Sequence, residues 1–480
     1  MTSSRMKKIS LFIAFFLSTG CASYRPKPVL PGETLSRFES RTLANPGLRE
    51  YIRRNRILEP PRWPPKEWNL SLLTLAAFYY HPDLDVARTE RDVEKAKVAR
   101  AGERPNPRLS FTPAYNSDAA SGVSPWILGL VLNFPIETAG RRGYRVEEAQ
   151  HLLDAARLHI AEVAWRVRSR LRASLLELYR LTQAEAILKK RLEVAAKLLQ
   201  AREQRLAAGE ASRLEVEMAR AALVQSDLCL GQARTQAGEE RARLAQVLGV
   251  PLAALDEVKL SFDSLSRPPA AADIPSAAVQ RQALTNRTDI LAALARYAAS
   301  QSSLQLEIAR QYPDLQIGPG YQWDQSAEKW SLGLSLTLPV FHRNQGRIEE
   351  AKARRRMVAA RFVALQVKVI GELDRAMAGY RATLAELGIA RSLAAVQRSR
   401  EDALTKRIEA GYTDRVTLYD ARLETLSAED AELSALVRAQ QALGALENAV
   451  ERPLDGADGI PAAFGENPQI ESSQDKGLEP

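Results

Sequence analysis

The clearest pattern in the chain is a strict alternation of apolar with small or polar residues, and it occurs twice. Trp126–Ile136 reads W-I-L-G-L-V-L-N-F-P-I and Trp330–Val340 reads W-S-L-G-L-S-L-T-L-P-V, with six of eleven positions identical across 204 residues. A period of two predicts a β-strand with one apolar face, and about nine residues at about 3.3 Å each let a tilted strand cross a bilayer. A half-buried strand of a soluble sandwich fits the alternation equally well, so the flanking sequence has to decide.

A second apolar segment precedes each copy and carries a proline at the same place. Residues 106–115 read N-P-R-L-S-F-T-P-A-Y and residues 312–321 read Y-P-D-L-Q-I-G-P-G-Y. Proline inside a strand removes a ladder donor and normally argues against a strand. Its recurrence in both copies instead predicts a built-in irregularity. We therefore expect four strands, at about 109–116, 126–134, 315–323 and 330–338.

Each strand pair is followed by a long block without proline. Residues 136–250 and 340–452 contain none of the 25 prolines, and residues 144–208 also lack glycine. A continuous helix over the last range would be about 95 Å long at about 1.5 Å per residue, which no compact domain needs. Heptad-spaced apolar residues predict helix packed along helix in coiled-coil style. These residues are Leu214, Ala221 and Leu228; Tyr419, Leu426 and Leu433; and Leu436, Leu443 and Val450.

Each block contains one internal turn with the motif R-x-x-A-G, which ends at Gly209 and at Gly411. Glycine supplies the left-handed conformation that ends a helix, and Ser212 or Asp414 can cap the helix that follows. The chain is therefore a repeat of strand pair, long helix, turn and long helix, preceded by a shorter helix. The first of these shorter helices is expected to begin near Asn69 or Ser71 and to run to about Glu103 with a kink at Pro82.

The ends of the chain differ from the repeats. Basic residues, an apolar run over 9–17 and small residues before Cys21 predict a secretory signal peptide. Prolines crowd the next segment, which is expected to be an extended arm. The predicted divisions are a signal peptide (1–20), a proline-rich N-terminal arm (21–68), repeat one (69–254), a linker (255–275), repeat two (276–455) and a disordered tail (456–480).

Composition narrows the function classes. Of 480 residues 45% are hydrophobic, 26% charged and only 6% aromatic, which indicates a helix-rich chain without a large compact core. The net charge of +9 is interspersed along helices, so a solvated surface is favoured over nucleic-acid binding. Two cysteines and four histidines show neither a disulfide framework nor metal-ligand spacing, and Cys229 is expected to be a small core residue. No catalytic constellation is present, so we predict that the chain is not an enzyme and needs no cofactor or metal.

With four strands and four very long helices, the chain resembles the TolC-type outer membrane efflux proteins over roughly residues 69–455. The resemblance rests on N-P-x-L or Y-P-D-L before a strand, W-x-L-G-L-x-L-x-x-P, G-R-x-E-E-A opening a long helix and R-x-x-A-G at its turn. Four strands cannot close a barrel alone and lipid forbids an open edge, so subunits must share one sheet. The resemblance implies a mainly α protein with a transmembrane β-barrel: a homotrimer with a shared twelve-stranded barrel that continues as a periplasmic α-helical tunnel.

The resemblance also implies a function. The chain would be the outer membrane channel of a tripartite efflux system, passively conducting substrate from an inner-membrane pump of the RND type, through a periplasmic adaptor, to the exterior. Arg205, Gly209, Arg407 and Gly411 would then lie in the periplasmic tip turns that contact the adaptor.

Two carboxylates are candidates for a gate in the tunnel. By similarity, Asp420 and Glu215 match positions of an acidic ring that narrows the lumen and would favour cations. The alternative is that both are ordinary solvated helix-surface charges. At two other gating positions the chain departs from the family, with Ile408 and Thr413 where tyrosine and arginine can occur.

The resemblance further implies a lipid anchor and the points where the barrel passes into the helices. The leader ends like the lipobox of bacterial lipoproteins, with Cys21 as the lipidated residue, although Ser18 stands where leucine is usual. We therefore expect a lipid-anchored, barrel-spanning protein in contact with outer membrane lipid and extending into the periplasm. Pro135 and Pro339 would mark the passage from barrel to helix.

The transported substrate stays open at this point. The turn F-H-R-N-Q-G at 341–346 looks like that of the cobalt-zinc-cadmium branch, which would imply a metal-exporting pump. The turn is mainly structural and His342 has no partner ligand nearby in the sequence, so drugs or other small molecules are favoured over metal ions. A type I protein-secretion conduit of the same fold and a periplasmic coiled-coil scaffold lipoprotein are the competing hypotheses. Trp126, Trp323 and Trp330 flank strand ends, where they would be interfacial belt residues or ordinary packing residues.

Overall fold

A computed structural model describes residues 24–55, 62–271, 274, 285–412 and 414–454. It divides into two units, Met1–Thr42 and Leu43–Pro480, which are considered separately. Cys21, Thr413, the predicted signal peptide and the predicted tail lie outside the described residues. The described residues of the first unit include the helix α2 (Pro31–Glu39), whose apolar Leu35 and Phe38 are exposed.

The expectation of an extended arm over residues 21–68 was wrong for two segments, α2 and α3 (Pro46–Asn55). Both helices begin at a proline, because the first position of a helix needs no N–H donor and has the φ that proline fixes. In the second unit, Leu48, Tyr51 and Ile52 of α3 are buried and pack with α4 (Leu70–Tyr80) in the main core. In this segment Pro31 and Pro46 are the first residues of helices and do not indicate irregular chain.

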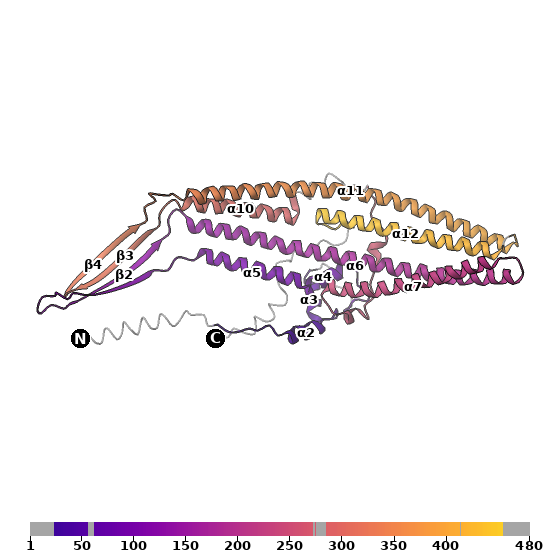
Figure 1. Cartoon of the computed structure of the whole chain (residues 1–480), viewed down its shortest axis with the longest axis horizontal. Coiled ribbons are helices and arrows are strands. Elements are labelled where there is room, and N and C mark those ends of the chain that lie inside the picture. Colours follow the sequence, from indigo (N-terminus) through magenta and orange to yellow (C-terminus); the bar gives the residue numbers. More distant parts are fainter. Residues whose placement is uncertain (1–23, 56–61, 272–273, 275–284, 413, 455–480) are drawn as a thin grey trace. The chain divides into compact units, whose positions relative to one another are not determined.

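All four expected strands are present and form one antiparallel sheet in the order β1-β2-β3-β4 (Figure 1). Their bounds are β1 Arg108–Tyr115, β2 Trp126–Ile136, β3 Leu315–Asp324 and β4 Ala327–Leu336. The last strand starts and ends earlier than expected, since it pairs with β3 from Ala327 to Leu336. Both edge strands, β1 and β4, lack a partner on their outer sides within the described part of the chain.

The strand register separates the side chains into two faces. Pairs such as Phe111 with Leu130, Leu130 with Tyr321, and Tyr321 with Trp330 lie on one face. That face is apolar except for Glu328 at the hairpin end, and its members are Leu109, Phe111, Pro113 and Tyr115; Trp126, Leu128, Leu130, Leu132, Phe134 and Ile136; Leu315, Ile317, Pro319, Tyr321 and Trp323; and Trp330, Leu332, Leu334 and Leu336. The opposite face is mainly small and polar, which is the alternation of a strand between lipid and water.

Aromatic residues gather at the hairpin end of the apolar face. The rings of Tyr115 and Trp126 are 5.2 Å apart, and those of Tyr321 and Trp330 are 4.9 Å apart. Trp323 lies one residue before the end of β3 on the same face. The three tryptophans thus lie toward the hairpin end of the apolar face, where a girdle at a membrane interface is expected.

The strand prolines interrupt the sheet without ending it. Between β2 and β3 the pairing runs from Val131 opposite Gly320 to Phe134 opposite Ile317, and the intervening positions, which include Pro319, form no pair. Pro135 was expected to end its strand, but β2 continues to Ile136. Pairing with β1 stops at Asn133, so one side of β2 needs no donor at Pro135. Pro339 lies three residues beyond the end of β4.

The helices match the proline-free blocks closely. The first block forms α6 (Arg141–Ala207, 67 residues) and α7 (Arg213–Leu248, 36 residues). The second forms α11 (Gln345–Glu409, 65 residues) and α12 (Arg415–Val450, 36 residues). Shorter helices precede each strand pair, α5 (Pro82–Gly102) in the first repeat and α10 (Thr288–Ala309) in the second. The expected kink at Pro82 is a full break, since α4 ends at Tyr80 and His81 is extended.

The long helices pack in the order α7–α6–α12–α11, so α7 and α11 form the two edges of the group. The heptad stripe predicted on α7 does not pack within the single chain. Leu214 and Leu228 are 69% and 54% exposed, whereas Val216 and Leu230 on the neighbouring stripe are buried against the rest of the unit. Of the residues predicted on α12, Tyr419 is half-buried and the others are buried, namely Leu426, Leu433, Leu436, Leu443 and Val450. Edge helix α7 thus keeps a second apolar stripe uncovered in the single chain.

A buried polar cluster joins the two repeats. Glu447 of α12 is 1% exposed and lies 3.2 Å from Arg168 and 3.3 Å from Arg172 of α6. Arg172 also donates to the Gln440 side chain at 2.7 Å, and that amide donates to the carbonyl of Leu265 in the linker at 3.0 Å. A buried carboxylate needs this degree of pairing to remain charged, so removal of either arginine would leave an uncompensated charge.

The linker is ordered where the structure describes it. It contains the 3₁₀ turn η1 (Leu252–Leu255) and the short helix α8 (Asp263–Ser266), and Leu260 pairs with Trp68 in a parallel bridge. None of the described helices has both the length and the apolar run that crossing a membrane would require.

Gly249 ends α7 in a close contact that predicts a strong mutational effect. Its φ is +76°, and an added Cβ would lie 2.7 Å from the carbonyl oxygen of Tyr80. Gly249→Ala is expected to lower the free energy of unfolding by about 2 kcal/mol or more, since left-handed strain and a backbone clash add. Thermal unfolding followed by helix circular dichroism measures this. The control is Gly231→Ala, inside α7 with open space around it, which should leave stability equal or slightly higher; equal losses in both variants would contradict the prediction.

Candidate functional site at the helical tip

The two tip turns have the same hydrogen-bonded form. Gly209 and Gly411 have φ of +76° and +78°. The N–H of Gly209 donates to Leu206 and that of Glu210 to the carbonyl of Arg205 at 2.8 Å; in the second turn Gly411 donates to Ile408 and Tyr412 to Arg407 at 2.9 Å. These are Schellman motifs, which satisfy the last carbonyls of α6 and α11. The arginine of R-x-x-A-G is thus the residue whose carbonyl closes the turn.

The helices that leave the turns are capped as expected. Ser212 and Glu215 form a reciprocal capping box, with the Ser212 N–H donating to the Glu215 carboxylate at 2.7 Å. Asp414 accepts from the Thr417 N–H at 2.8 Å and from its hydroxyl at 2.7 Å. Each cap pins one acidic side chain beside the turn.

Arg202, which the sequence did not single out, brings the two predicted gate carboxylates together. Its guanidinium lies 2.8 Å from Glu215 of α7 and 3.4 Å from Asp420 of α12. Only 21% of its side chain is exposed, against 43% and 46% for the two carboxylates. One arginine of α6 therefore contacts both its own hairpin and the hairpin of the second repeat.

Arg205 makes a second contact between the hairpins. It donates to the capping carboxylate of Asp414 at 2.8 Å, while the equivalent Arg407 is exposed and forms no side-chain hydrogen bond or ion pair with the described residues. The two hairpins are thus tied by α6 arginines, Arg202 and Arg205, to α12 carboxylates. Neither contact was predicted, because each joins residues more than 200 positions apart.

The pKa values of the three tip carboxylates are shifted in different directions. The Ser212 N–H, with the Arg202 and Arg205 charges, holds the pKa of Glu215 below its ordinary value. Donation from Thr417, with the same arginines, lowers the pKa of Asp414. Burial raises the pKa of Asp420, and the Arg202 charge opposes that rise.

These directions predict how pH acts on the tip. A carboxylate with a lowered pKa stabilises the folded contact above its ordinary pKa, and that contribution is lost as pH falls through the lowered value. For Glu215 and Asp414 the loss comes below their ordinary values of 4.5 and 3.8. The pKa of Asp420 is shifted in the opposite direction, so protonation of Asp420 does not add to this loss. If the tip gates a channel, as the resemblance implies, conductance in planar bilayers should be low at neutral pH and should rise below about pH 4; a rise confined to pH above 5 would contradict this assignment.

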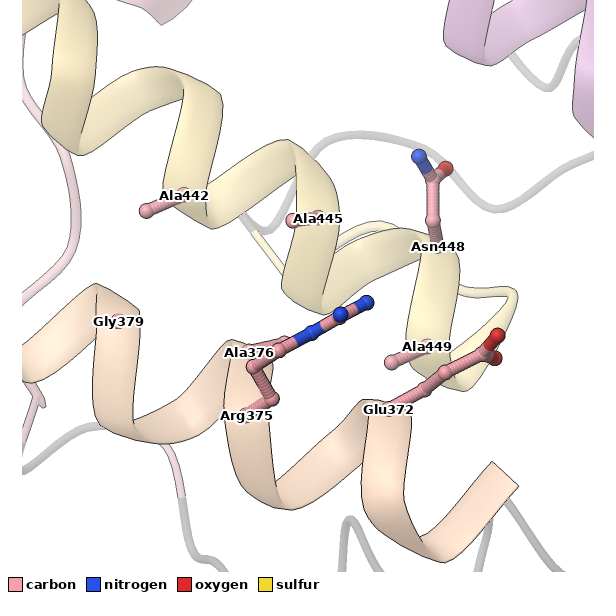
Figure 2. Close-up of a pocket in the computed structure, with 8 residues that line it drawn as sticks. All are labelled: Glu372, Arg375, Ala376, Gly379, Ala442, Ala445, Asn448 and Ala449. Carbon is pink, nitrogen blue, oxygen red and sulfur yellow. The ribbon is translucent and has the colours of Figure 1, made fainter. Parts of the chain in front are cut away.

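Outside the tip, a groove of about 380 Å³ lies between α11 and α12 (Figure 2). Its floor is made of small residues, Ala376 and Gly379 on α11 and Ala442, Ala445 and Ala449 on α12. Figure 2 shows the Arg375 side chain extending across the groove toward α12, between Glu372 and the α12 alanines. The small floor lets the two helices approach, and the groove has no carboxylate cluster that would bind a cation.

The remaining candidate residues have structural surroundings. Cys229 is half-buried in α7, rather than a core residue, and its Sγ is 3.4 Å from the Gln225 amide. In the R-N-Q-G turn, Asn344 (φ +60°) donates to the carbonyl and the carboxylate of Glu307, both at 2.8 Å. His342 is exposed, and the described residues contain no group of side chains suited to hold a metal ion.

An amphipathic sheet with unpaired edges, continued by two long helical hairpins that meet at a polar tip, defines the architecture of outer membrane channels with a helical tunnel. The sequence profile of the outer membrane efflux protein family matches residues 77–250 and 279–451, one match for each repeat. The chain belongs to this family.

Two curated relatives were compared. The cobalt-zinc-cadmium resistance protein CzcC of Cupriavidus metallidurans is 26% identical over 56% of this chain and 62% of its own length. The pyoverdine export outer membrane protein OpmQ of Pseudomonas aeruginosa is 28% identical over 68% of this chain and 71% of its own. The match to CzcC thus spans less than two thirds of that relative.

Solved structures support the fold. The outer-membrane channel OprN superposes with a TM-score of 0.66 at 21% identity, covering 90% of this chain and 98% of OprN. The outer membrane protein VceC of Vibrio cholerae gives 0.64 at 19% identity, covering 79% and 95%. The mainly helical, internally duplicated fold with four strands is that of the TolC-type channels.

Proposed function

We propose that the chain is the outer membrane channel component of a tripartite efflux system and that three copies share one barrel. The observation that carries this proposal is the sheet, whose apolar face is continuous while β1 and β4 have no outer partners. Lipid forbids unpaired strand edges, so β4 of one copy must pair with β1 of the next until the sheet closes.

The helices support the same assembly. The edge helices α7 and α11 each expose an apolar stripe, at Leu214, Met218 and Val224 on one and at Ile389, Leu393 and Val396 on the other. Apolar stripes at helical spacing on both edges suit contact between neighbouring copies. Such a ring encloses a tunnel that ends at the tip turns, where Arg205, Gly209, Arg407 and Gly411 would contact a periplasmic adaptor, with an inner-membrane pump of the RND type beyond it.

In this proposal the tip is the closed end of the tunnel. Arg202 and Arg205 hold the two hairpins together, and the tunnel widens when those contacts break. Asp420 and Glu215 then lose their arginine partner, and both carboxylates, with Glu215 still in its capping box, present negative charge to the passing substrate. Three copies of each would form an acidic ring that favours cations.

Heavy-metal cations are the proposed cargo class, supported by the tip carboxylates and by the likeness to CzcC. Deleting the gene should lower tolerance to cobalt, zinc or cadmium salts, by severalfold in minimal inhibitory concentration, because export loses its outer conduit. The same sensitivity test should include pyoverdine and drugs, since OpmQ is a pyoverdine export protein. Unchanged tolerance to every cation, with altered tolerance to an organic compound, would reject the metal assignment and keep the channel.

Membrane attachment has its own test. Cys21, which lies outside the described residues, would be lipidated and would anchor the N-terminal arm in the outer membrane. Labelled palmitate should enter the wild-type chain and not Cys21→Ser. Label in both forms would reject lipidation at this residue.

A further inference from the structure

An arginine-lined cavity lies where the strands give way to the helices of the first repeat. It has a volume of about 360 Å³ and is formed by the segments before β1, after β2 and at the start of α6. Its lining residues are Arg104, Pro105, Pro135, Ile136, Glu137, Gly140, Arg141, Arg142 and Gly143. Three arginines and one carboxylate give the lining an excess of positive charge.

Some of the charged groups that line the cavity already pair with other residues. Arg141 lies 2.7 Å from Asp314 and donates to backbone carbonyls after α10, so its guanidinium ties the two strand pairs together. Glu137 is paired with Arg145. Arg104 and Arg142, by contrast, form no hydrogen bond or ion pair with any part of the chain that the structure describes. Arg142 is half-buried and Arg104 is exposed.

The cavity adjoins the apolar face of the sheet. Ile136 lines the cavity and also belongs to that face, where it and Phe134 are 42% and 41% exposed. Pro105 and Pro135 add further apolar lining. A molecule that filled the cavity would thus meet guanidinium groups at one end and strand side chains that face lipid at the other.

Resting on the proposed placement of the sheet in the outer membrane, we infer that this cavity binds the phosphate headgroup of a phospholipid in the periplasmic leaflet. Arg104 and Arg142 bind the phosphate oxygens, and the acyl chains lie along Phe134 and Ile136. The shape suits an amphipathic anion, because guanidinium groups pair with phosphate by charge-assisted hydrogen bonds. The single negative charge of the phosphodiester would offset part of the charge of the two arginines at the membrane boundary, and the lipid would hold the strand ends at a fixed depth.

Native mass spectrometry of the full assembled protein in maltoside detergent tests this inference. The probes are dioleoyl phosphatidylglycerol and, without a phosphate, dioleoylglycerol. Wild-type protein should retain the phospholipid over the diacylglycerol, and Arg104→Gln with Arg142→Gln should lose retention by about thirtyfold, since each basic residue contributes about fivefold. Arg142→Lys should keep most of it. The control is Arg356→Gln, an exposed arginine of α11 outside the cavity.

The outcomes separate this inference from the proposed function. Equal retention of the two lipids by wild type, or full retention by the double glutamine variant, overturns the lipid site while conductance and outer membrane location stay intact. Displacement of the phospholipid by excess inorganic phosphate alone, with no dependence on acyl chains, would mean that the cavity recognises free phosphate and would overturn the lipid assignment. Absence of the protein from the membrane fraction would instead reject the proposed function.

Discussion

Leu334→Arg is expected to abolish assembly of the channel in the outer membrane. Leu334 lies on the apolar face of β4, opposite Ile317, and is 66% exposed in the single chain. An arginine facing lipid costs up to about 2–4 kcal/mol, the value at the bilayer midplane, and a trimer carries it three times, so the total reaches at most roughly 6–12 kcal/mol. That penalty is comparable to the whole stability of a folded domain. Heat-resistant trimers on gels, together with outer membrane fractionation, measure the loss.

The neighbouring residue supplies the control. Ser335 lies on the polar face, opposite Gln316, and its side chain would point into the water-filled interior of the proposed barrel. Ser335→Arg should therefore assemble and reach the membrane at near wild-type levels, with altered conductance. If both variants assembled equally well, the apolar face would not face lipid, and the coiled-coil scaffold hypothesis would regain support.

The regular elements were predictable because their signals are local. Alternation over ten residues predicts a strand, absence of proline over more than a hundred permits a long helix, and Gly209 or Gly411 ends it. The internal repeat strengthened these predictions. Because a proline stands at the same place in both copies, Pro113 and Pro319 could be assigned to strands. Errors appeared where a local signal had two meanings, as at Pro31 and Pro46, where proline starts a helix.

What the sequence could not supply is which surfaces meet. Helix α7 has two apolar stripes, and heptad spacing alone selected the one with Leu214, which the single chain leaves exposed. The structure buries the stripe with Val216, because α6 contacts that side. The exposed stripe was still an informative prediction, since it suits a contact with another copy.

Long-range charge pairs were equally inaccessible. Arg168 and Glu447 are 279 positions apart, and Arg202 and Asp420 are 218 apart. In a chain with 67 basic and 58 acidic residues, no spacing rule selects these pairs. The family resemblance pointed to Asp420 and Glu215 but not to Arg202, which contacts both. The gating positions that it suggested besides these carry Ile408 and Thr413 in this chain.

Arg202→Ala is expected to open the tip. Arg202 contacts Glu215 and Asp420, whose side chains are 43% and 46% exposed, so solvent screens both ion pairs. Only the pair with Asp420 joins the two hairpins; such a pair contributes about 0.2–1 kcal/mol, so three copies sum to roughly 0.6–3 kcal/mol of closure energy. The open fraction should then rise by about tenfold, since about 1.4 kcal/mol is a factor of ten. Single-channel recording of open probability in planar bilayers measures it.

A matched control separates closure between the hairpins from general loosening. Arg220 of α7 pairs with Glu203 of α6 at 3.2 Å and with Glu217 at 3.0 Å, so both of its contacts stay within the first hairpin. Arg220→Ala removes the same number of exposed ion pairs and should leave the open probability near wild type. Arg202→Lys, which keeps the charge, should be intermediate. An equal rise in Arg220→Ala would mean that any weakened hairpin opens the channel, and an unchanged Arg202→Ala would show that Arg202 does not hold the tip closed.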